Sequence, residues 1–420
     1  MTNSMDHRGE ASDVPSRAAT AGLYTMAILF CAVIAAKPAQ AQTFTVLHTF
    51  AGGETDGENP YAGLIRDNAG NLYGTTLNGG WRVPGHGTVF KLDTAGALTT
   101  LHTFDHRGDG IKPYGGLVRD RAGNLYGMTP WGIGRKAGNG IIYRIETTGK
   151  EAIPHRFTGG SDGGNPHGGL IRDQAGNLYG GTEIGGTHGC GVLFDVNNGV
   201  ESVLYTFTGS EVNGDGCSSA GDLVRDQTSG DLYGTTSFGG NQPGCGTVFK
   251  LDSTGKETIL HAFNCLNGTD GSNPAAGLIL DQAGNLYGTT THSRPTGMGT
   301  VFRIDTTGDN YSILYTFSGG ADGSTPMGPV VMDTAGNLYG TTRYGGNLSC
   351  GHSGEGCGVA FELKTTGEEF VLHAFSGPDG MAPSSGLVLD AAGNLYGTAP
   401  RGGNTACAGG CGVVFKITSR

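Results

Sequence analysis

Histidine is the side chain in this sequence best suited to acid–base chemistry, because its imidazole gains or loses a proton near neutral pH. Six histidines lie outside any regular spacing, in Gly-rich segments: His86, His106, His167, His188, His292 and His352. Glu183 precedes His188, and Glu355 follows His352. Either pair has the residue types of a general acid and base, and the spacing selects neither.

Aromatic residues in two of the Gly-rich segments are candidates for ligand stacking. Trp81 and Trp131 are the only tryptophans, and polar residues follow both. Such rings stack on carbohydrate or peptide, although loop tryptophans also cap the ends of sheets, and both interpretations stay open. The candidate ligand-binding residues are Trp81, Arg82, His86, Trp131, Arg135, Glu183, His188, His292, Arg343 and His352.

An Asp-Gly pair recurs at seven places and is the one candidate for metal binding. Its aspartates are Asp56, Asp109, Asp162, Asp215, Asp270, Asp322 and Asp379. Asp-Gly is typical of a turn, in which Asp accepts hydrogen bonds from its own backbone. A ring of carboxylates that binds Ca²⁺ is the alternative, but no EF-hand spacing is present. We expect no other cofactor.

These candidates alternate with a repeated stretch, Ala69-Gly70-Asn71-Leu72-Tyr73-Gly74. Its tyrosine recurs every 52 to 57 residues, at 73, 126, 179, 233, 287, 339 and 396. A fixed period of this length indicates a repeat architecture with one supersecondary unit per repeat. We therefore predict a single domain over residues 42–420.

Each repeat has the pattern of four short antiparallel strands. In the first unit these are 63–67, 72–76, 88–92 and 100–104, with tight Gly- and Asn-containing turns after the first and third strands. Val89, Phe90 and Leu92 place apolar side chains on both faces of one strand, which indicates a sheet covered on both sides. Radially stacked blades meet this requirement, so the fold class is all-β, a seven-bladed β-propeller.

The ends of the array predict a closed ring. Residues 44–50 match the fourth strand of a unit, whereas the last unit stops at its third strand, 412–417. We expect the N-terminal strand to complete the last blade, because this removes the open edge.

Histidine also occupies one regular position, in the predicted outer strands. His48, His102, His155, His261 and His373 occupy it, and Tyr205 and Tyr315 replace them in two units. A position that accepts His or Tyr in every unit indicates packing or a hydrogen bond.

Arginine ends the predicted inner strands of the first four units, at Arg66, Arg119, Arg172 and Arg225. Each either pairs with a nearby acid or helps to hold an anionic sugar or carboxylate.

The unit motifs resemble those of a known family. Gly-Leu-Ile-Arg-Asp, Ala-Gly-Asn-Leu-Tyr-Gly-Thr-Thr, Gly-Thr-Val-Phe-Lys-Leu and Leu-His-Thr-Phe are similar to the GloVer tandem repeat of secreted bacterial proteins, in all seven units. The resemblance implies export and no established activity. The Asp-x-x-Gly-Asn-Leu-Tyr core also resembles NHL-type propeller blades, which implies that residues 63–67 lie innermost and 101–104 outermost. The longer loops 77–87, 130–140 and 343–358 then share one face, the predicted binding face.

Residues 1–41 have the pattern of a secretory signal. An apolar run from Ala21 to Ala36 precedes Ala39 and Ala41, so we expect cleavage before Gln42. We expect no membrane span in the mature chain, and a protein that is secreted or periplasmic. The net charge of −11 argues against nucleic-acid binding.

Cysteine usage agrees with export. One of the nine cysteines, Cys31, lies in the signal, which leaves an even number. Shared loops pair Cys350 with Cys357 and Cys407 with Cys411, and the mirror positions about Gly255 pair Cys245 with Cys265. Cys190 with Cys217 remains by elimination.

Two functions fit this sequence. The first is a non-enzymatic, monomeric scaffold that binds a glycan, a peptide or an extracellular protein through the face of variable loops. The second is a lyase or hydrolase that acts on polysaccharide, and it requires His, Glu, Arg or Tyr to converge on that face. Catalytic residues stay unassigned, because no P-loop or zincin motif appears.

Overall fold

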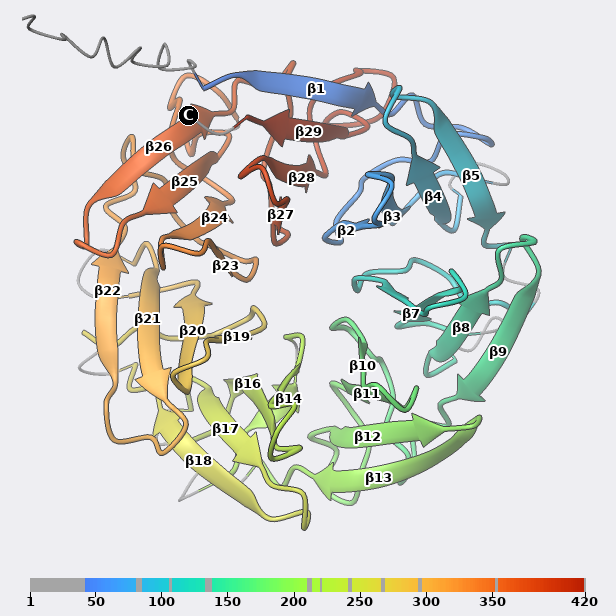
Figure 1. Ribbon diagram of the computed structural model, residues 1–420, viewed down its shortest axis with the longest axis vertical. Coiled ribbons are helices and arrows are strands. Elements are labelled where there is room, and N and C mark those ends of the chain that lie inside the picture. Colours follow the sequence, from blue (N-terminus) through green and yellow to red (C-terminus); the bar gives the residue numbers. More distant parts are fainter. Residues whose placement is uncertain are drawn as a thin grey trace, which may run out of the picture. The chain divides into compact units, whose positions relative to one another are not determined.

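The computed structural model describes residues 42–80, 85–105, 108–132, 138–209, 214–219, 221–240, 244–265, 269–293, 297–351 and 354–418. These residues form seven antiparallel sheets arranged around a central axis as a seven-bladed β-propeller (Figure 1). The described residues contain no helix, and therefore none that could span a membrane. The predicted fold class is confirmed.

Every blade has the same strand order, from the inner strand to the outer strand. Blade 1 has β2 (Ile65–Arg66), β3 (Leu72–Thr76), β4 (Thr88–Leu92) and β5 (Leu98–Thr103). Blade 2 has β6 (Val118–Arg119), β7 (Leu125–Thr129), β8 (Ile141–Ile145) and β9 (Glu151–Arg156). Blade 3 has β10 (Ile171–Arg172), β11 (Leu178–Gly181), β12 (Val192–Asn197) and β13 (Val200–Thr206). Blade 4 has β15 (Val224–Arg225), β16 (Leu232–Phe238), β17 (Thr247–Leu251) and β18 (Glu257–Ala262). An extra strand, β14 (Cys217–Ser219), also pairs with β16.

The remaining three blades follow the same order. Blade 5 has β19 (Ile279–Leu280), β20 (Asn285–Thr290), β21 (Thr300–Asp305) and β22 (Ser312–Thr316). Blade 6 has β23 (Val331–Met332), β24 (Leu338–Thr342), β25 (Val359–Leu363) and β26 (Glu369–Ala374). Blade 7 has β27 (Val388–Leu389), β28 (Leu395–Ala399), β29 (Val413–Ile417) and the N-terminal β1 (Phe44–Thr49). The inner strands are shorter than predicted, at two residues each.

The ring closes as the sequence predicts. β1 pairs antiparallel with β29, with Phe44 opposite Ile417 and Thr49 opposite Val413. Beyond the strands, the Thr418 amide donates to the Thr43 carbonyl at 2.9 Å. The first and last strands therefore share one sheet, and blade 7 exposes no more edge than the other blades (Figure 1).

Apolar side chains fill the space between neighbouring blades. Val89 and Phe104 of blade 1 pack with Ile141 and Tyr143 of blade 2 in one buried cluster. An aromatic ring of the third strand lies over the glycine of the hexapeptide, so that a Cβ on Gly74 would lie 2.7 Å from Phe90 Cζ. The last glycine of the hexapeptide therefore makes room for this ring, and both faces of the sheets are covered as predicted.

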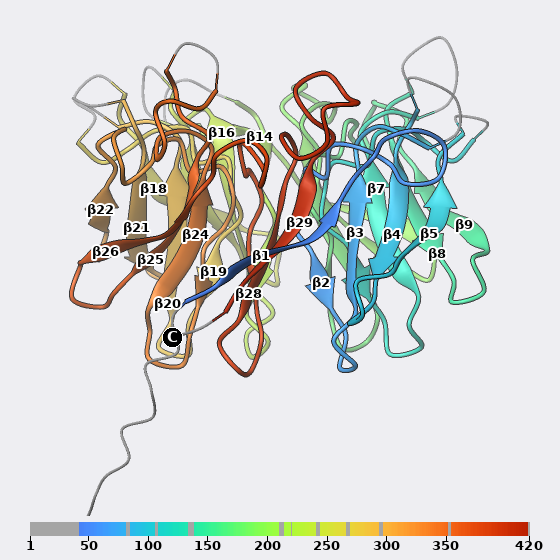
Figure 2. The same cartoon turned by 90° about the horizontal axis from the view of Figure 1, so that it is seen from above.

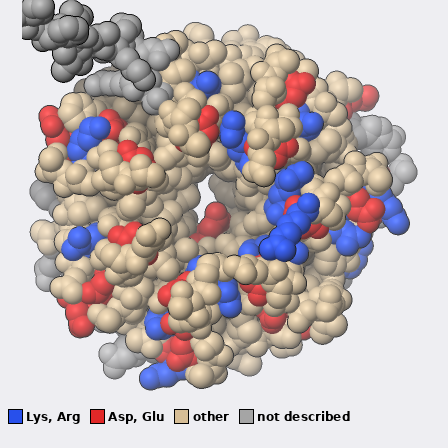
Figure 3. Space-filling model, viewed as in Figure 1, with Lys and Arg blue, Asp and Glu red and all other residues tan. Residues whose placement is uncertain are grey.

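The blades approach most closely at the axis, where backbone meets backbone. A Cβ on Gly115 would lie 2.2 Å from the carbonyl oxygen of Gly168, and one on Gly221 would lie 2.5 Å from that of Ala276. Threonines of the second strands hydrogen-bond across the same seams, such as Thr398 of blade 7 to the Ala62 carbonyl of blade 1 at 3.1 Å. Figure 3 shows the opening that remains at the centre of the ring.

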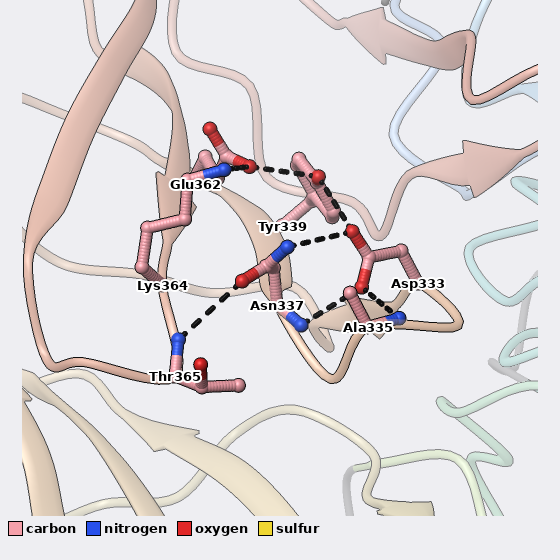
Figure 4. A network of polar contacts seen from close by, with 7 residues as sticks. All are labelled: Asp333, Ala335, Asn337, Tyr339, Glu362, Lys364 and Thr365. Carbon is pink, nitrogen blue, oxygen red and sulfur yellow. Dashed lines mark hydrogen bonds and ion pairs between the residues drawn. The ribbon is translucent and has the colours of Figure 1, made fainter.

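The hexapeptide forms a hydrogen-bonded turn around one aspartate (Figure 4). In blade 6, Asp333 Oδ1 accepts from the backbone amides of Ala335 and Asn337 at 2.9 and 2.8 Å. Its Oδ2 accepts from Asn337 Nδ2 at 2.8 Å and from the Tyr339 hydroxyl at 3.0 Å. The turn of blade 4 differs, because Asp231 replaces the Asn and bonds to Lys250 at 2.6 Å. The hexapeptide is thus a structural element of each blade.

The arginines of the inner strands cover these turns and extend to the neighbouring blade. Arg66 lies over the Tyr396 ring at 5.7 Å, Arg119 over Tyr73 at 5.7 Å, and Arg225 over Tyr179 at 5.6 Å. Each of these tyrosines belongs to the preceding blade. Figure 3 shows basic side chains gathered along one side of the central opening. From the sequence we expected these arginines either to pair with an acidic residue or to hold an anion. The structure instead shows a cation–π contact across the seam.

All four predicted disulfides are present. Cys190–Cys217 links the loop before β12 to β14, and so joins blades 3 and 4. The other three, Cys245–Cys265, Cys350–Cys357 and Cys407–Cys411, each lie within one unit. Four disulfides indicate an oxidising compartment, either extracellular or periplasmic.

The Asp-Gly aspartates lie at the outer wall of the ring, where each faces the regular His or Tyr of its own unit. The carboxylates contact the ring nitrogen or hydroxyl in the pairs His48–Asp56 (2.8 Å), His102–Asp109 (3.1 Å), Tyr205–Asp215 (2.5 Å), His261–Asp270 (3.1 Å), Tyr315–Asp322 (3.0 Å) and His373–Asp379 (2.8 Å). His155 and Asp162 are 3.7 Å apart. The regular His or Tyr position and the Asp-Gly position therefore form the same side-chain contact in each unit.

In four seams of the outer wall, a glutamate of the next blade lies near this aspartate. The glutamates are Glu151, Glu201, Glu257 and Glu369, and one buried carboxyl oxygen of each has no hydrogen-bond partner. Burial and then the charge of Asp215 raise the pKa of Glu257 to about 7. Burial and then the charge of Asp322 raise the pKa of Glu369 to about 7.

We predict that the protein loses stability as the pH rises through 7. The folded state holds a proton on Glu257 and Glu369 more tightly than the unfolded chain, whose glutamates titrate near 4.5. Their contribution is therefore complete below pH 4.5 and disappears above 7, by about 2 kcal/mol in total after allowance for solvent screening. Melting temperatures between pH 5 and 9 measure this slope. The double variant Glu257→Gln, Glu369→Gln should flatten it, and an unchanged slope would contradict the assignment.

We predict that Asp333→Ala lowers stability more than Asp226→Ala does. Asp333 accepts four hydrogen bonds, including one from the Tyr339 hydroxyl, whereas the turn of Asp226 has bonds from the Thr228 and Ser229 amides. The expected cost for Asp333→Ala is about 2 kcal/mol, measured by denaturant unfolding. Equal effects at both positions would show that the turn network contributes nothing beyond the two backbone bonds.

Candidate functional site

The long loops lie on one face of the ring and the short turns on the other (Figure 2). The second-to-third and fourth-to-first connections form the loop face, which agrees with the predicted strand order. Each fourth-to-first connection leads directly into an inner strand at the axis. Residues at the end of these connections therefore meet from all seven blades.

These residues line a cavity of about 350 Å³ on the axis. One position of the repeat, immediately after the proline that precedes most inner strands, varies in residue type from blade to blade. It is occupied by Tyr61, Tyr114, His167, Ala275, Met327 and Ser384, all of which line the cavity. The equivalent Ala220 of blade 4 lies outside the described residues. The wall is thus aromatic on the side of blades 1 to 3 and small or aliphatic on the side of blades 5 to 7.

The aromatic residues form a continuous arc. The Tyr61 and Tyr114 ring centroids lie 5.4 Å apart with 22° between their planes. The Tyr114 and His167 rings lie 3.9 Å apart with 36° between their planes. Burial raises the pKa of Tyr114, so its hydroxyl stays protonated and available as a donor. The three rings therefore pack against one another and form one continuous aromatic part of the cavity wall.

Glu183 and Arg343 follow the second strand in blades 3 and 6, at equivalent positions of the repeat. Glu183 lines the cavity, and its Oε1 lies 3.9 Å from His167 Nδ1. Burial lowers the pKa of His167, and the charge of Glu183 opposes this shift. Arg343 Nη1 contacts the sulfur of Met327 at 3.3 Å. Both charges act on Tyr114, since Arg343 lowers its pKa and Glu183 raises it.

Asp222 is the acidic residue of the inner wall. It replaces the glycine that the equivalent position has in blades 1, 2, 3, 5 and 7. The backbone amide of Gly169 in blade 3 donates to its carboxylate, and its backbone lies against Gly277 of blade 5. Burial raises the pKa of Asp222, and the hydrogen bond from the Gly169 amide opposes this shift. The cavity wall therefore combines an aromatic arc with two acidic side chains, Glu183 and Asp222.

Of the predicted binding residues, Glu183 lines this cavity, and Arg343 lies behind the wall, where it contacts the lining residue Met327. His86, Trp131, His188 and His292 lie in loops of the same face but do not line the cavity. The Trp131 ring lies 5.7 Å from Lys112 Nζ, and the His188 side chain is exposed. The rest of the predicted set, Trp81, Arg82, Arg135 and His352, lies outside the described residues.

The sequence analysis missed Tyr61, Tyr114 and Asp222, and noted His167 only as a loop histidine. A signal for them was present. Tyr61, Tyr114 and His167 directly follow the proline that six of the seven units share, at a position whose residue type differs between units, and Asp222 replaces a glycine that five units share. In a repeat protein, the positions that depart from the repeat are those the fold leaves free for binding.

In the described part of the chain, two sets of three side chains bring potential metal-ligand atoms close together. Neither set lines the cavity. The Asp-Gly aspartates lie at the outer wall and contact the His or Tyr of their own units. This supports the turn interpretation, and calcium binding by these residues stays an untested prediction.

Solved structures match this chain at low similarity. One is the nidogen/laminin complex, with 16% identity, a TM-score of 0.43, and coverage of 70% of this chain and 91% of that chain. Another is a gluconolactonase, XC5397 from Xanthomonas campestris, with 12% identity, a TM-score of 0.42 and 90% of both chains. A third is a luciferin-regenerating enzyme, with 14% identity, a TM-score of 0.43, and 75% of this chain and 93% of that chain. At these scores the likenesses carry no argument about activity.

No curated protein matches the chain. The Gloeobacter/Verrucomicrobia repeat does match, over residues 32–226 and 219–420. Together the two matches span nearly the whole chain and agree with the resemblance of all seven units. The chain belongs to the Gloeobacter/Verrucomicrobia repeat family.

Proposed function

We propose that the protein is an exported, non-enzymatic propeller that binds a glycan in the axial cavity of its loop face. The observation that carries this proposal is the arc of Tyr61, Tyr114 and His167 beside two carboxyl groups. A sugar ring has an apolar face of C–H groups and a rim of hydroxyls. The arc matches the face, and polar groups at its edge match the hydroxyls.

The polar groups supply both donors and acceptors, as hydroxyl recognition requires. Glu183 and Asp222 supply carboxyl oxygens that accept, and the Tyr114 hydroxyl donates. Arg343, which contacts the lining residue Met327, is a nearby donor for a carboxylate or a sugar oxygen. A volume of about 350 Å³ lies at the small end of the range for ligand pockets, and suits one or two sugar rings at the end of a chain.

Export supports an extracellular ligand. The predicted signal over residues 1–41 and the four disulfides both favour a protein that works outside the cytoplasm. The matrix and envelope of bacteria contain glycans that such a protein would meet.

We predict that Tyr61→Ala and Tyr114→Ala each weaken glycan binding by about tenfold or more, because each removes one stacking surface. A glycan array with the purified protein identifies the ligand, and calorimetric titration measures the affinity. The matched control is Phe238→Ala, which removes an aromatic side chain that is 55% exposed at the end of β16 and outside the cavity. Loss of binding in the control but not in the tyrosine variants would place the site on the loops. Failure of all glycans to bind would reject the proposal.

Catalysis in the same cavity is the second candidate function. It is favoured by the convergence of His167, Glu183 and Tyr114, since the sequence analysis required such a set for a polysaccharide lyase or hydrolase. His167 with its lowered pKa is a neutral base near pH 7, and Glu183 orients it. Arg343 would neutralise the carboxylate of an acidic sugar while a proton is removed beside it.

We predict that any turnover of acidic polysaccharide is lost in His167→Ala and retained in His188→Ala. His188 is the matched control, because it is an exposed histidine on the same face. The ultraviolet absorbance of the new double bond reports a lyase, and reducing-end release reports a hydrolase. Glycan binding without turnover by the unmodified protein would eliminate this second candidate and leave the first intact.

A further inference from the structure

The outer wall contains a second arrangement of side chains with its own chemistry. In every seam, the His–Asp or Tyr–Asp pair of one blade faces the start of the outer strand of the next blade. The facing residue is aromatic in two seams, where Phe44 stacks on His373 at 3.6 Å and Tyr311 stacks on His261 at 3.9 Å. Leu98 occupies the equivalent position in blade 1, opposite Leu92, and Glu151 occupies it in blade 2, opposite Ile145.

The seam between blades 1 and 2 brings together three potential metal ligands. The ligand atoms of His102, Asp109 and Glu151 all lie within 4.8 Å of one another. His102 Nε2 is 3.1 Å from Asp109 Oδ2, and Asp109 is only 6% exposed. A carboxyl oxygen of Glu151 is buried and has no hydrogen-bond partner, as in Glu201, Glu257 and Glu369 of other seams. Among these four seams of the described residues, only this one brings the oxygen together with a histidine and an aspartate whose ligand atoms lie within 4.8 Å, so the unpartnered oxygen is available as a third ligand here.

Acidic side chains outnumber basic ones at this seam. Asp105 lies beside the proposed ligands, since its backbone amide donates to the Asp109 carboxylate. Arg156 is the neighbouring basic residue, and its Nη1 donates to the Gly108 carbonyl at 2.7 Å.

The other close group of potential ligands in the described residues is unsuited to a metal. It consists of Glu58, Cys407 and Cys411, and the two sulfurs are joined in a disulfide. A disulfide sulfur carries no thiolate to donate. In the seam between blades 2 and 3, His155 and Asp162 lie farther apart, at 3.7 Å.

We propose that His102, Asp109 and Glu151 bind one divalent transition-metal ion, of which Zn²⁺ is the representative, and that this ion clamps blade 1 to blade 2. Imidazole and carboxylate are ligands that zinc uses in proteins, and three protein ligands with water in the fourth position complete a tetrahedral site. The ion connects β5 to β9, so its binding energy adds to the stability of the folded ring.

The test is metal binding by the purified, tag-free protein after treatment with chelator. We expect ZnCl₂ to bind once per chain in calorimetric titration and to raise the melting temperature by about 3 °C or more at saturating metal. Co²⁺ should give the visible absorption of a tetrahedral site. Glu151→Gln should weaken Zn²⁺ binding at least about a hundredfold, since it removes one of three ligands but keeps the shape of the side chain.

Two further variants make the result specific. Glu369→Gln is the matched control, because Glu369 occupies the same position in a seam where Tyr315 replaces the histidine. The Glu369→Gln variant should bind Zn²⁺ as tightly as the unmodified protein. Leu98→Glu places a carboxylate beside His48 and Asp56, and should create a second Zn²⁺ site. Absence of saturable Zn²⁺ binding, or binding that survives Glu151→Gln, would overturn the proposal. Binding of Ca²⁺ in place of Zn²⁺ would overturn the assigned metal class.

Discussion

The close approach of seven backbones at the axis is the constraint on which the rest of this structure depends. Gly115 and Gly168 touch through their main chains, and Gly221 meets Ala276 in the same way. A larger side chain at these points would push neighbouring blades apart, and the change would spread around a closed ring. Threonine hydrogen bonds such as Thr398 to Ala62 then fix the height of each blade relative to the next. The equivalent residue is small in every blade, as Ala62, Gly115, Gly168, Gly221, Ala276, Gly328 or Ser385.

The axial cavity lies next to these close contacts, on the side of the loop face. The residue that precedes each close contact lines the cavity in six blades, where no neighbouring backbone restricts its side chain. Residue type is free to vary there, and it does, from Tyr61 and Tyr114 to Ser384. Asp222 shows how far the freedom extends, because it stands where most blades have glycine and contacts two neighbouring inner strands. The outer wall offers a similar freedom, at the positions of Leu98, Glu151 and Phe44.

The sequence predicted the propeller, its closure and all four disulfides, because each of these follows from periodicity or from local spacing. It placed the long loops together on one face, and of the residues that line the candidate cavity it singled out Glu183 as a binding residue. Glu183 and Arg343 were recognised as charged loop residues, whereas Tyr61 and Tyr114 resembled ordinary residues of a turn. What joins them is convergence on an axis, and the seven contributing positions are about fifty residues apart in the chain. The arginine contacts were missed for a similar reason, since each tyrosine partner belongs to the preceding blade.

The pairing of β1 with β29 also dictates the order in which the molecule is built. These strands lie at opposite ends of the chain, and their contact at Thr43 and Thr418 spans 375 residues. During synthesis β1 is made first, and it must wait as an unpaired edge until β29 emerges. The final contact has the largest loop-closure entropy in the molecule, so it forms late and slowly. An unfinished chain consequently carries a strand that accepts foreign partners, and only the completed ring is protected from aggregation.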